Sequence, residues 1–421
     1  MEKDLERPLT GNLKSDGQPL SIKEYERCGG YEALRKALKQ MSPNEVLDVV
    51  TASNLRGRGG AGFPTGQKWS VVPTEEDAHP RYFISNSDEM EPGAFKDRLL
   101  MEGNPHQLIE GIIIGSYATG TDRAYIFLRW EYGESAKRLR KAVAEAYEAG
   151  YLGENIIGSG YRLNVYLHVS AGRYICGEET ALLGALEGRR AIPRSKPPFP
   201  QVSGLWGKPA IVNNAETLSN VPHIVKNGAE WYKGLSRSAD GGTKIYGVSG
   251  RVKRPGSWEL PMGITMRELL IEYAGGMKDG LTLRGILPGG GSTDFLLEEH
   301  LDTRMDFDSL QKAGSRLGTG TMIILDDRTC PVGMVANLER FFARESCGWC
   351  APCREGLPWV AEIVTSIENG LGQEEDIALL EQQTGLLGPG RTYCAHAPGA
   401  MEPLQSALKF FKEDFTHHVR E

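Results

Sequence analysis

Apolar positions in the first 240 residues recur with two spacings, one typical of buried strands and one typical of amphipathic helices. Short apolar runs predict strands over residues 81–85, 124–130 and 162–169, and helical spacing predicts helices over 42–55 and 135–149, with further helix starts at Asn104-Pro105 and near Gly177. The proline-rich residues 193–200 predict a loop, because neither a helix interior nor a central strand accommodates them. Strands that alternate with helices predict an α/β fold with a mostly parallel sheet.

The pattern changes near Lys244. Short strands are predicted over 244–248 and 256–260, a helix over 265–274 and an apolar segment over 322–325, which together are typical of a small α+β unit. Beyond Pro331 the apolar spacing is helical, in 334–342, 357–367 and 377–387, and predicts a small helical bundle. We therefore expect three domains, at residues 1–240, 241–329 and 330–421.

The composition narrows the classes of function. No apolar run reaches the roughly 18 residues that a membrane-spanning helix requires, so we expect no direct membrane insertion. The net charge of −7 argues against bulk nucleic-acid binding, which needs clustered Lys and Arg. Residues 1–7 lack the apolar core of a secretion signal and are too acidic for a transit peptide, so we expect a mature, cytoplasmic chain. Seven cysteines, an odd number, argue against a disulfide framework.

A glycine loop follows the helix predicted over 42–55, whose N-cap we expect at Ser42. Gly57-x-Gly59-x-x-Gly62 fits the Rossmann fingerprint literally, but that fingerprint requires a strand before the glycines, and here a helix precedes them. Backbone N–H groups freed by glycine can still approach a phosphate, and Arg58 and Lys68 would add positive charge. The loop predicts a phosphate cradle; a flexible surface loop is the alternative.

Polar clusters follow the predicted strands. Asn86 to Gly93 contains an amide and three carboxylates directly after a strand, where ligand-facing loops of α/β sheets lie. Glu178 and Glu179 stand at a strand-to-helix turn, where a glutamate can be either a ligand or a residue that complements the helix dipole. Asn213-Asn214 with Thr217 are open to the same two interpretations, ligands or caps and turns. Cys176 has no partner at metal spacing and is interpreted as structural.

Four cysteines carry the strongest chemical signal. Cys347-x-x-Cys350-x-x-Cys353 supplies three thiolates within two turns of chain, and Cys394 can supply a fourth for a cubane iron-sulfur cluster. Zinc is an alternative, although structural zinc sites usually use two separated pairs of ligands. A redox dithiol at Cys350 and Cys353 is a second alternative, but residues 337–345 before it have the pattern of a helix instead of the required strand.

Taken together, these motifs resemble the NADH-binding flavoprotein subunit of respiratory NADH:quinone oxidoreductase, complex I. The resemblance runs from about residue 20 to residue 415. The motifs that carry it are residues 57–66, 86–93, 174–182, 196–200, 212–217 and 345–356.

The resemblance implies a non-covalent FMN site and an NADH site above it. Around FMN it places Gly57, Arg58, Gly59, Gly60, Ala61, Gly62, Lys68, Asn86, Asp88, Glu89, Tyr174, Gly177, Glu178, Asn213, Asn214 and Thr217. For NADH it implies Phe63 and Phe199 beside the adenine, hydrogen bonds from Glu91 and Glu179, and Lys68 and Lys196 nearby. Glu89, Glu91 and Glu179 would orient the reactants, and no residue would act as a general acid or base.

The resemblance also implies the rest of the electron path. A Rossmann-like FMN and NADH domain would be followed by a β-grasp domain and a four-helix bundle that carries a 4Fe-4S cluster on the four cysteines. NADH would reduce FMN by hydride transfer, and single electrons would pass to the cluster. They would continue to a thioredoxin-like 2Fe-2S subunit, the larger iron-sulfur subunit of the peripheral arm, and finally quinone. The complex would lie on the inner face of the cell membrane.

Two other functions remain open at this point. The same module occurs as the diaphorase part of an NAD-linked hydrogenase or formate dehydrogenase. A chain of a different class, a non-catalytic nucleotide-binding module stabilised by zinc, would carry zinc without iron. Three positions depart from the family pattern: Val71 near the nucleotide, Met90 in the acidic loop, and His396 after the fourth cysteine.

Overall fold

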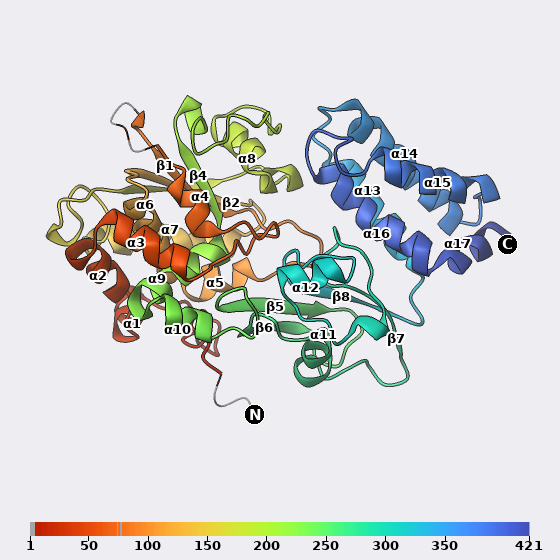
Figure 1. Ribbon diagram of the computed structural model, residues 1–421, viewed down its shortest axis with the longest axis horizontal. Helices are drawn as coiled ribbons and strands as arrows, with labels where there is room; N and C mark the ends of the chain where they lie inside the picture. The colour runs from red at the N-terminus through yellow and green to blue at the C-terminus, as the bar shows by residue number, and fades with distance from the viewer. Residues whose placement is uncertain (1–4, 74, 76–77, 421) are drawn as a thin grey trace. The chain divides into compact units, whose positions relative to one another are not determined.

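A computed structural model describes residues 5–73, 75 and 78–420 of the chain (Figure 1). Met1 to Asp4, part of the segment from which a mature amino terminus was inferred, lie outside the described residues. Two compact units are present: residues 1–90, 95–245 and 259–263 form the first, and residues 91–94, 246–258 and 264–421 the second. Within the described ranges, none of the helices combines the length and hydropathy that a membrane crossing requires.

The first unit is built on a parallel sheet of four strands in the order β3-β2-β1-β4. The strands are β1 (Tyr82–Ser87), β2 (Arg123–Leu128), β3 (Asn164–Val169) and β4 (Ala210–Asn214). All three neighbouring pairs run parallel, so the α/β fold with a parallel sheet is confirmed. The pattern had predicted β1, β2 and β3 but not β4.

Helices surround this sheet and share one core with it. They are α1 (Ile22–Arg27), α2 (Glu32–Gln40), α3 (Pro43–Ala52), α4 (Thr65–Ser70), α5 (Asp97–Gly103), α6 (Pro105–Ala118), α7 (Gly133–Glu148), α8 (Glu179–Leu186), α9 (Ala215–Asn227) and α10 (Ala229–Gly234). α6 is buried on almost every side and presents Ile109, Ile112 and Ile113 to the core. Gly111 lets α6 approach α9 closely, because a Cβ there would lie 2.0 Å from the carbonyl oxygen of Leu218.

Two predicted helices differ from the structure in extent. Ser42 is the N-cap of α3, as expected, and its hydroxyl accepts a hydrogen bond from the Glu45 N–H. α3 nevertheless ends at Ala52 and not at residue 55, because Asn54 adopts a left-handed conformation with φ 53° that no α-helix can contain. The helix predicted over 265–274 is α-helical only at α11 (Met266–Glu268) and continues as one π-helical turn to Tyr273.

A second sheet contains β6-β5-β8-β7, with β5 parallel and β7 antiparallel to β8. Its strands are β5 (Thr243–Ser249), β6 (Gly256–Pro261), β7 (Leu283–Leu287) and β8 (Thr321–Asp326), and α12 (Phe307–Lys312) lies between the last two in the chain. The carboxyl-terminal helices are α13 (Pro331–Glu345), α14 (Ala351–Glu368), α15 (Glu374–Leu386), α16 (His396–Phe410) and α17 (Lys412–Arg420). α13 packs on both α14 and α16, so the predicted helical bundle is confirmed, with short α17 added to four longer helices.

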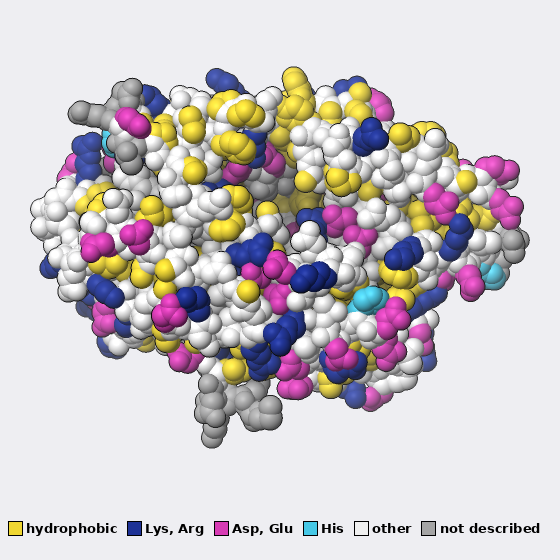
Figure 2. Space-filling model, viewed as in Figure 1, with side chains coloured by type: hydrophobic (Ala, Val, Ile, Leu, Met, Phe, Trp, Pro, Cys, Tyr) yellow, Lys and Arg dark blue, Asp and Glu magenta, His cyan; other side chains and the backbone are white. Residues whose placement is uncertain are grey.

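The surface mixes charges of both signs. Figure 2 shows Lys and Arg side chains interspersed with Asp and Glu side chains over the face in view. On this face neither sign of charge gathers into one large patch.

Candidate functional site

The order of strands in the first sheet defines where a ligand can bind. The chain runs from β1 to β2 and β3 on one side, and returns to β4 on the other side of β1. In a parallel α/β sheet such a switch in direction opens a crevice at the carboxyl ends of the two strands concerned. Asn86 of β1 pairs in register with Asn214 of β4, so the polar segments predicted as ligand-binding loops leave the sheet at this crevice.

The glycine loop lies against the same end of β4. The backbone N–H of Arg58 donates to Oγ1 of Thr217, 2.8 Å away. A Cβ on Gly59 would lie 3.1 Å from Cβ of Asn214, so only glycine allows this approach without a shift of its neighbour. Gly60 and Gly62 have φ values of 129° and 66°, which L-residues rarely adopt. The loop is therefore a candidate phosphate cradle at the switch point.

The side chain of Arg58 does not take the place expected from the sequence. It is fully buried, and its guanidinium donates to the hydroxyl of Tyr232 and to the carbonyl oxygens of Gly241 and Thr243. Its charge therefore stabilises the interior of the unit and is not presented to a phosphate. The backbone N–H groups of residues 59–62 remain the loop's candidate phosphate donors.

Both asparagines at the end of β4 accept hydrogen bonds from other residues of the first unit. Asn214 is the N-cap of α9, where its Oδ1 accepts from the N–H groups of Glu216 and Thr217. Asn213 accepts a hydrogen bond of 2.9 Å from the indole N–H of Trp69. The interpretation as caps is thus confirmed for Asn214. These bonds also fix the positions of both amides at the crevice.

Hydrogen bonds of Glu89 hold the acidic loop after β1 in place. The carboxylate of Glu89 accepts from the N–H groups of Lys96, Asp97 and Arg98 at the start of α5. The guanidinium of Arg129 donates to the backbone carbonyl of Glu89. Burial, aided by the charge of Asp97, raises the pKa of Glu89. Its side chain therefore anchors the loop.

Two further residues of this loop have defined positions. The hydroxyl of Ser170, directly after β3, lies 3.2 Å from Oδ2 of buried Asp88. Asn86 donates to the carbonyl oxygen of Gly177 at 3.3 Å, which joins this loop to the turn at Tyr174–Gly177. A Cβ on Gly177 would meet open space, so this turn leaves room beside Asn86.

Two lysines and two glutamates form a charge cluster beside the crevice. Nζ of Lys68 lies 2.7 Å from Glu179 and 2.8 Å from the carbonyl oxygen of Val212 in β4. Lys196 contacts both Glu178, at 3.0 Å, and Glu179, at 2.9 Å. Burial alone would raise the pKa of Glu179, but Lys68 and Lys196 outweigh it and hold the pKa below its ordinary value. Glu179 is thus an ionised carboxylate beside the crevice.

Glu178 differs from its neighbour. Its carboxylate accepts from the N–H groups of Thr180 and Ala181 and is the N-cap of α8. The helix-dipole interpretation of Glu178 is therefore confirmed.

Three other predicted residues have defined surroundings. Phe63 and Phe199 are 50% and 55% exposed, which is unusual for phenylalanine and leaves both rings accessible to a ligand. Glu91 belongs to the second unit, where its carboxylate accepts from the N–H of Ser292 at 2.7 Å.

A buried ion network was missed by the sequence reasoning. Glu216, the second residue of α9, lies 2.8 Å from Lys96 and 3.2 Å from Lys244, and all three are fully buried or nearly so. Burial opposes ionisation of Glu216, but Lys244 and Lys96 lower its pKa to about 2. Lys96 also contacts Asp97, which accepts from Nδ2 of Asn214. No local signal in the sequence indicated this burial, because Glu216 stands among polar residues such as Asn214, Thr217 and Asn220.

The four cysteines come from two segments of the second unit. Cys347 lies in the turn after α13, Cys350 is the N-cap of α14, Cys353 lies in its first turn, and Cys394 precedes α16. Burial, together with the charges of Cys350, Cys394 and Cys347, raises the pKa of Cys353 to about 12. The structure therefore places the other three thiols close enough to Cys353 for their charges to raise its pKa. Bound cations would stabilise the thiolates.

Two residues close to these cysteines in the sequence have defined contacts. The hydroxyl of Ser346 lies 3.2 Å from Sγ of Cys353. Nε2 of His396, whose role the sequence left open, lies 2.8 Å from the carbonyl oxygen of Phe342 and so joins the start of α16 to α13. None of the seven cysteines, all of which the structure describes, forms a disulfide, as expected. Cys176 is buried, and it is far from the other six cysteines in the sequence. Both facts agree with a structural role.

Three models of known protein families match successive parts of the chain. Residues 50–223 match the Nuo51 FMN-binding domain, residues 245–293 the SLBB domain, and residues 333–418 the NADH-ubiquinone oxidoreductase-F iron-sulfur binding region. The chain is 58% identical to the F subunit of NADH-quinone oxidoreductase from Salmonella typhimurium over 98% of its own length and 93% of that relative. The Escherichia coli F subunit gives the same identity and coverage, and the F 2 subunit of Rhizobium meliloti is 50% identical over 96% of each chain.

A solved structure shows the same fold in another enzyme. A chain of the NAD+-reducing [NiFe]-hydrogenase in its H2-reduced state superposes with a TM-score of 0.85 at 32% identity. The match covers 96% of this chain and 67% of that one. The extent and identity of the sequence matches decide the assignment: the chain belongs to the family of NADH-quinone oxidoreductase F subunits.

Proposed function

We propose that this chain is the electron-input subunit of a respiratory NADH:quinone oxidoreductase: it oxidises NADH at a bound FMN and passes electrons through a 4Fe-4S cluster. The observation that carries the proposal is the glycine loop packed on Thr217 and Asn214 at the switch point between β1 and β4. A four-cysteine centre in the same chain would supply a one-electron acceptor for electrons from the reduced flavin.

The residues proposed for the site would hold both nucleotides without reacting themselves. Bound FMN would supply the hydride acceptor and the change from two-electron to one-electron chemistry. The N–H groups of residues 59–62 would bind its phosphate. The candidates for the rest of the flavin are Lys68, Asn86, Asp88, Glu89, Tyr174, Gly177, Glu178, Asn213, Asn214 and Thr217.

NADH recognition would use the exposed side chains near this site. Phe63 and Phe199 would stack on the adenine, and Glu179 would accept hydrogen bonds from ribose hydroxyls. Glu91 would supply a further carboxylate. Lys68 and Lys196 keep Glu179 ionised, and an ionised carboxylate at the adenine ribose would repel the additional phosphate of NADPH.

The four cysteines would hold the cluster through their thiolates. Ser346, beside Cys353, is placed to tune the reduction potential through a hydrogen bond to the sulfur. The donor set of four thiols fits a cubane cluster, which needs one ligand for each iron.

The wider assembly follows from the family. Its members belong to a multisubunit enzyme, and we propose as partners a thioredoxin-like 2Fe-2S subunit and the larger iron-sulfur subunit of the peripheral arm. We place the complex at the inner face of the cell membrane. Within the chain we propose the domain boundaries 1–240, 241–329 and 330–421.

Reduction of the purified chain tests the function directly. The protein is purified without oxygen, its flavin absorbance is recorded, and NADH is added. We expect the flavin band to bleach with NADH, and far more slowly with NADPH. A chain that contains FMN but does not bleach with NADH would contradict the proposal, and zinc in place of iron at the cysteines would contradict the proposed cluster.

A second candidate is favoured by the fold shared with the NAD+-reducing hydrogenase. In that case the chain would be the diaphorase part of a hydrogenase. Co-purification distinguishes the two: we expect the chain to be recovered with other complex I subunits, and recovery with a nickel-containing protein would favour the hydrogenase.

A further inference from the structure

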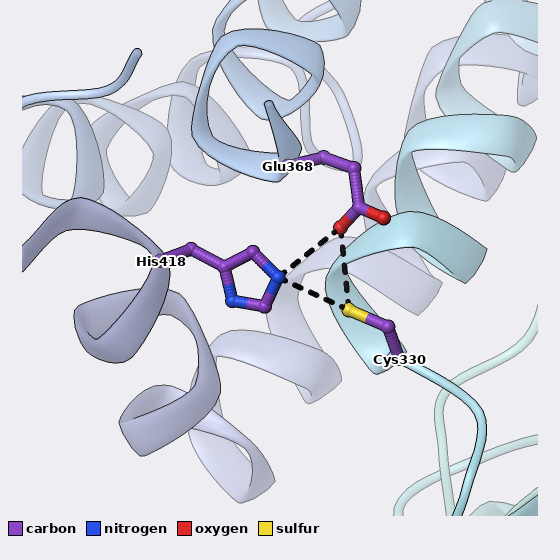
Figure 3. Close-up of side chains that lie close together, drawn as sticks. All are labelled: Cys330, Glu368 and His418. Carbon is purple, nitrogen blue, oxygen red and sulfur yellow. Dashed lines mark hydrogen bonds and ion pairs between the residues drawn. The ribbon is translucent and has the colours of Figure 1, made fainter. Parts of the chain in front are cut away.

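Three potential metal ligands meet at the far end of the carboxyl-terminal helices, outside the cysteine centre. Figure 3 shows Cys330, Glu368 and His418 with their side chains pointing toward one another. Sγ of Cys330 lies 3.2 Å from Oε2 of Glu368 and 3.4 Å from Nε2 of His418. Nε2 and Oε2 are 3.5 Å apart. One sulfur, one nitrogen and one oxygen atom thus form a nearly equilateral triangle.

Each of these residues is placed by a separate helix. Cys330 is the N-cap of α13, Glu368 is the last residue of α14, and His418 lies on α17. The N–H of Gly333 donates to Sγ of Cys330, but burial and the nearby Glu368 raise the pKa of this thiol, so the thiol keeps its proton until a cation replaces it. All three side chains are partly exposed, so an ion can reach them from solvent.

The tautomer of His418 suits metal binding. Nδ1 lies 2.8 Å from the backbone carbonyl oxygen of Asp414, which can only accept a hydrogen bond. Nδ1 therefore carries the ring proton, and Nε2 directs a lone pair at the sulfur and the carboxylate oxygen. Metal-binding histidines are commonly oriented by such a bond from the second ring nitrogen.

The arrangement does not fit a catalytic triad. In a triad the nucleophile and the orienting carboxylate contact different nitrogens of the histidine, so that a proton can be relayed. Here Cys330 and Glu368 both face Nε2. The Cys330 thiol donates a hydrogen bond to Oε2 of Glu368, so a cation bound between these atoms would take the place of that proton.

The dimensions of the triangle match a tetrahedral zinc ion. Zinc bonds of about 2.3 Å to sulfur, about 2.0 Å to nitrogen and about 2.1 Å to oxygen place the ligand atoms about 3.4–3.6 Å apart. The three observed separations span 3.2–3.5 Å, so the ligands need only small shifts. We propose that Cys330, Glu368 and His418 form a zinc site, with solvent as the fourth ligand.

The charge balance supports a divalent ion. Binding would deprotonate the Cys330 thiol and release that proton to solvent, while His418 stays neutral. One thiolate and one carboxylate then neutralise the two charges of zinc, and the mixed S, N and O donor set excludes magnesium and calcium, which prefer oxygen. Bound zinc would join α17 to α13 and α14.

Metal analysis of the complete protein tests the site. The full chain with its flavin and iron-sulfur cluster is equilibrated with zinc and separated from unbound metal, and zinc and iron are measured together. We expect one additional zinc per chain with the iron content unchanged. X-ray absorption at the zinc edge should show one sulfur and otherwise nitrogen and oxygen neighbours, whereas a zinc surrounded only by sulfur would overturn the proposal.

Matched variants locate the ion. Cys330→Ser and His418→Gln should weaken zinc binding by at least about tenfold, whereas His417→Gln, the adjacent histidine on the same helix, should leave it unchanged. Equal binding by His418→Gln and His417→Gln would overturn the assignment.

A further variant displaces a ligand without removing it. A Cβ on Gly333 would lie 2.5 Å from Oε1 of Glu368, so Gly333→Ala must push the carboxylate away. Alanine favours the helix by about 1 kcal/mol over glycine, so α13 should remain folded. We expect weaker zinc binding with unchanged flavin reduction by NADH; wild-type zinc affinity in this variant would contradict the role of Glu368.

Discussion

Nζ of Lys68 lies 2.7 Å from Oε2 of Glu179, and the same ammonium group donates to the carbonyl oxygen of Val212 in β4. One side chain therefore links the central sheet to the carboxylate proposed for NADH recognition. Because burial and the two neighbouring lysines act in opposite directions on Glu179, the pKa of this carboxylate depends on both lysines.

Replacement of Lys68 by Met should make NADH binding sensitive to acid. Without the Lys68 charge the pKa of Glu179 rises, so Glu179 becomes protonated at a higher pH than in the wild type. We expect KM for NADH to increase about tenfold, a loss comparable to one hydrogen bond to a charged group. The acidic rise in KM should also begin at a higher pH. The measurement is KM for NADH between pH 5 and pH 8. A pH profile unchanged from the wild type would contradict the role of Lys68 in keeping Glu179 ionised. Lys253→Met is the control.

Substitution of Gly59 by Ala should weaken FMN binding. The added Cβ would lie 3.1 Å from Cβ of Asn214 and force the loop away from the start of α9. We expect about tenfold weaker binding, the usual scale for crowding a close-packed contact. The flavin content that remains after dialysis measures the strength of FMN binding. Gly385→Ala, where the new Cβ meets open space, should retain all its flavin, and equal flavin loss in both variants would argue against the cradle.

Glu216→Gln should destabilise the first unit. The substitution leaves Lys96 and Lys244 without their shared carboxylate, and breaking a buried ion pair costs about 3–5 kcal/mol of unfolding free energy. Urea unfolding at pH 7 measures this loss. Asp279→Asn, which removes an exposed ion pair with Lys253, should change the midpoint little.

The same variant carries a pH signature. The pKa of Glu216 is about 2 in the folded chain and 4.5 ordinarily, so its stabilising contribution is complete above pH 4.5 and is lost as the pH falls toward 2. The difference in unfolding free energy between wild type and Glu216→Gln should shrink as the pH falls from 4.5 toward 2. A difference that grows over this range would contradict the ionised state of Glu216.

Cys353→Ser should remove the cluster and spare the flavin. Cys353 belongs to the second unit, whereas the proposed FMN contacts belong to the first. We expect iron and the cluster's electron paramagnetic resonance signal to be lost while FMN still bleaches with NADH. Cys28→Ser, an exposed cysteine outside the centre, should retain both. Loss of FMN with full retention of iron would show that the proposed division is wrong.

The sequence predicted those parts of the fold that depend on local spacing. The strands at 81–85, 124–130 and 162–169 and the helices after Ser42 and Asn104 follow from the period of apolar residues, and the structure confirms them within a few residues. β4 was missed because Ala210–Asn214 is short and ends in two asparagines, which are typical of a turn. Without β4 the switch point could not be derived from the pattern, although it positions the site.

The roles of individual polar residues were less accessible. Arg58, Glu89 and Glu178 were expected to lie around a ligand, and the structure adds internal hydrogen bonds from their side chains to buried carbonyls or helix starts that the motifs did not indicate. The composition of a motif cannot show which member points inward. Cys330, Glu368 and His418 left no motif at all, because 38 and 50 residues separate them along the chain and only tertiary packing brings them together.

The positions in the sequence of the four cysteines proposed to hold the cluster also affect biosynthesis. Three are made together at the start of α14, but the fourth follows only after α14 and α15 have been synthesised. During translation the first three thiols therefore exist for some time as an incomplete centre, exposed to oxidation or to capture of the wrong metal. A complete set of four thiols therefore exists only once the segment before α16 lies beside the first three cysteines, so the folding of a later part of the chain sets when all four ligands are present.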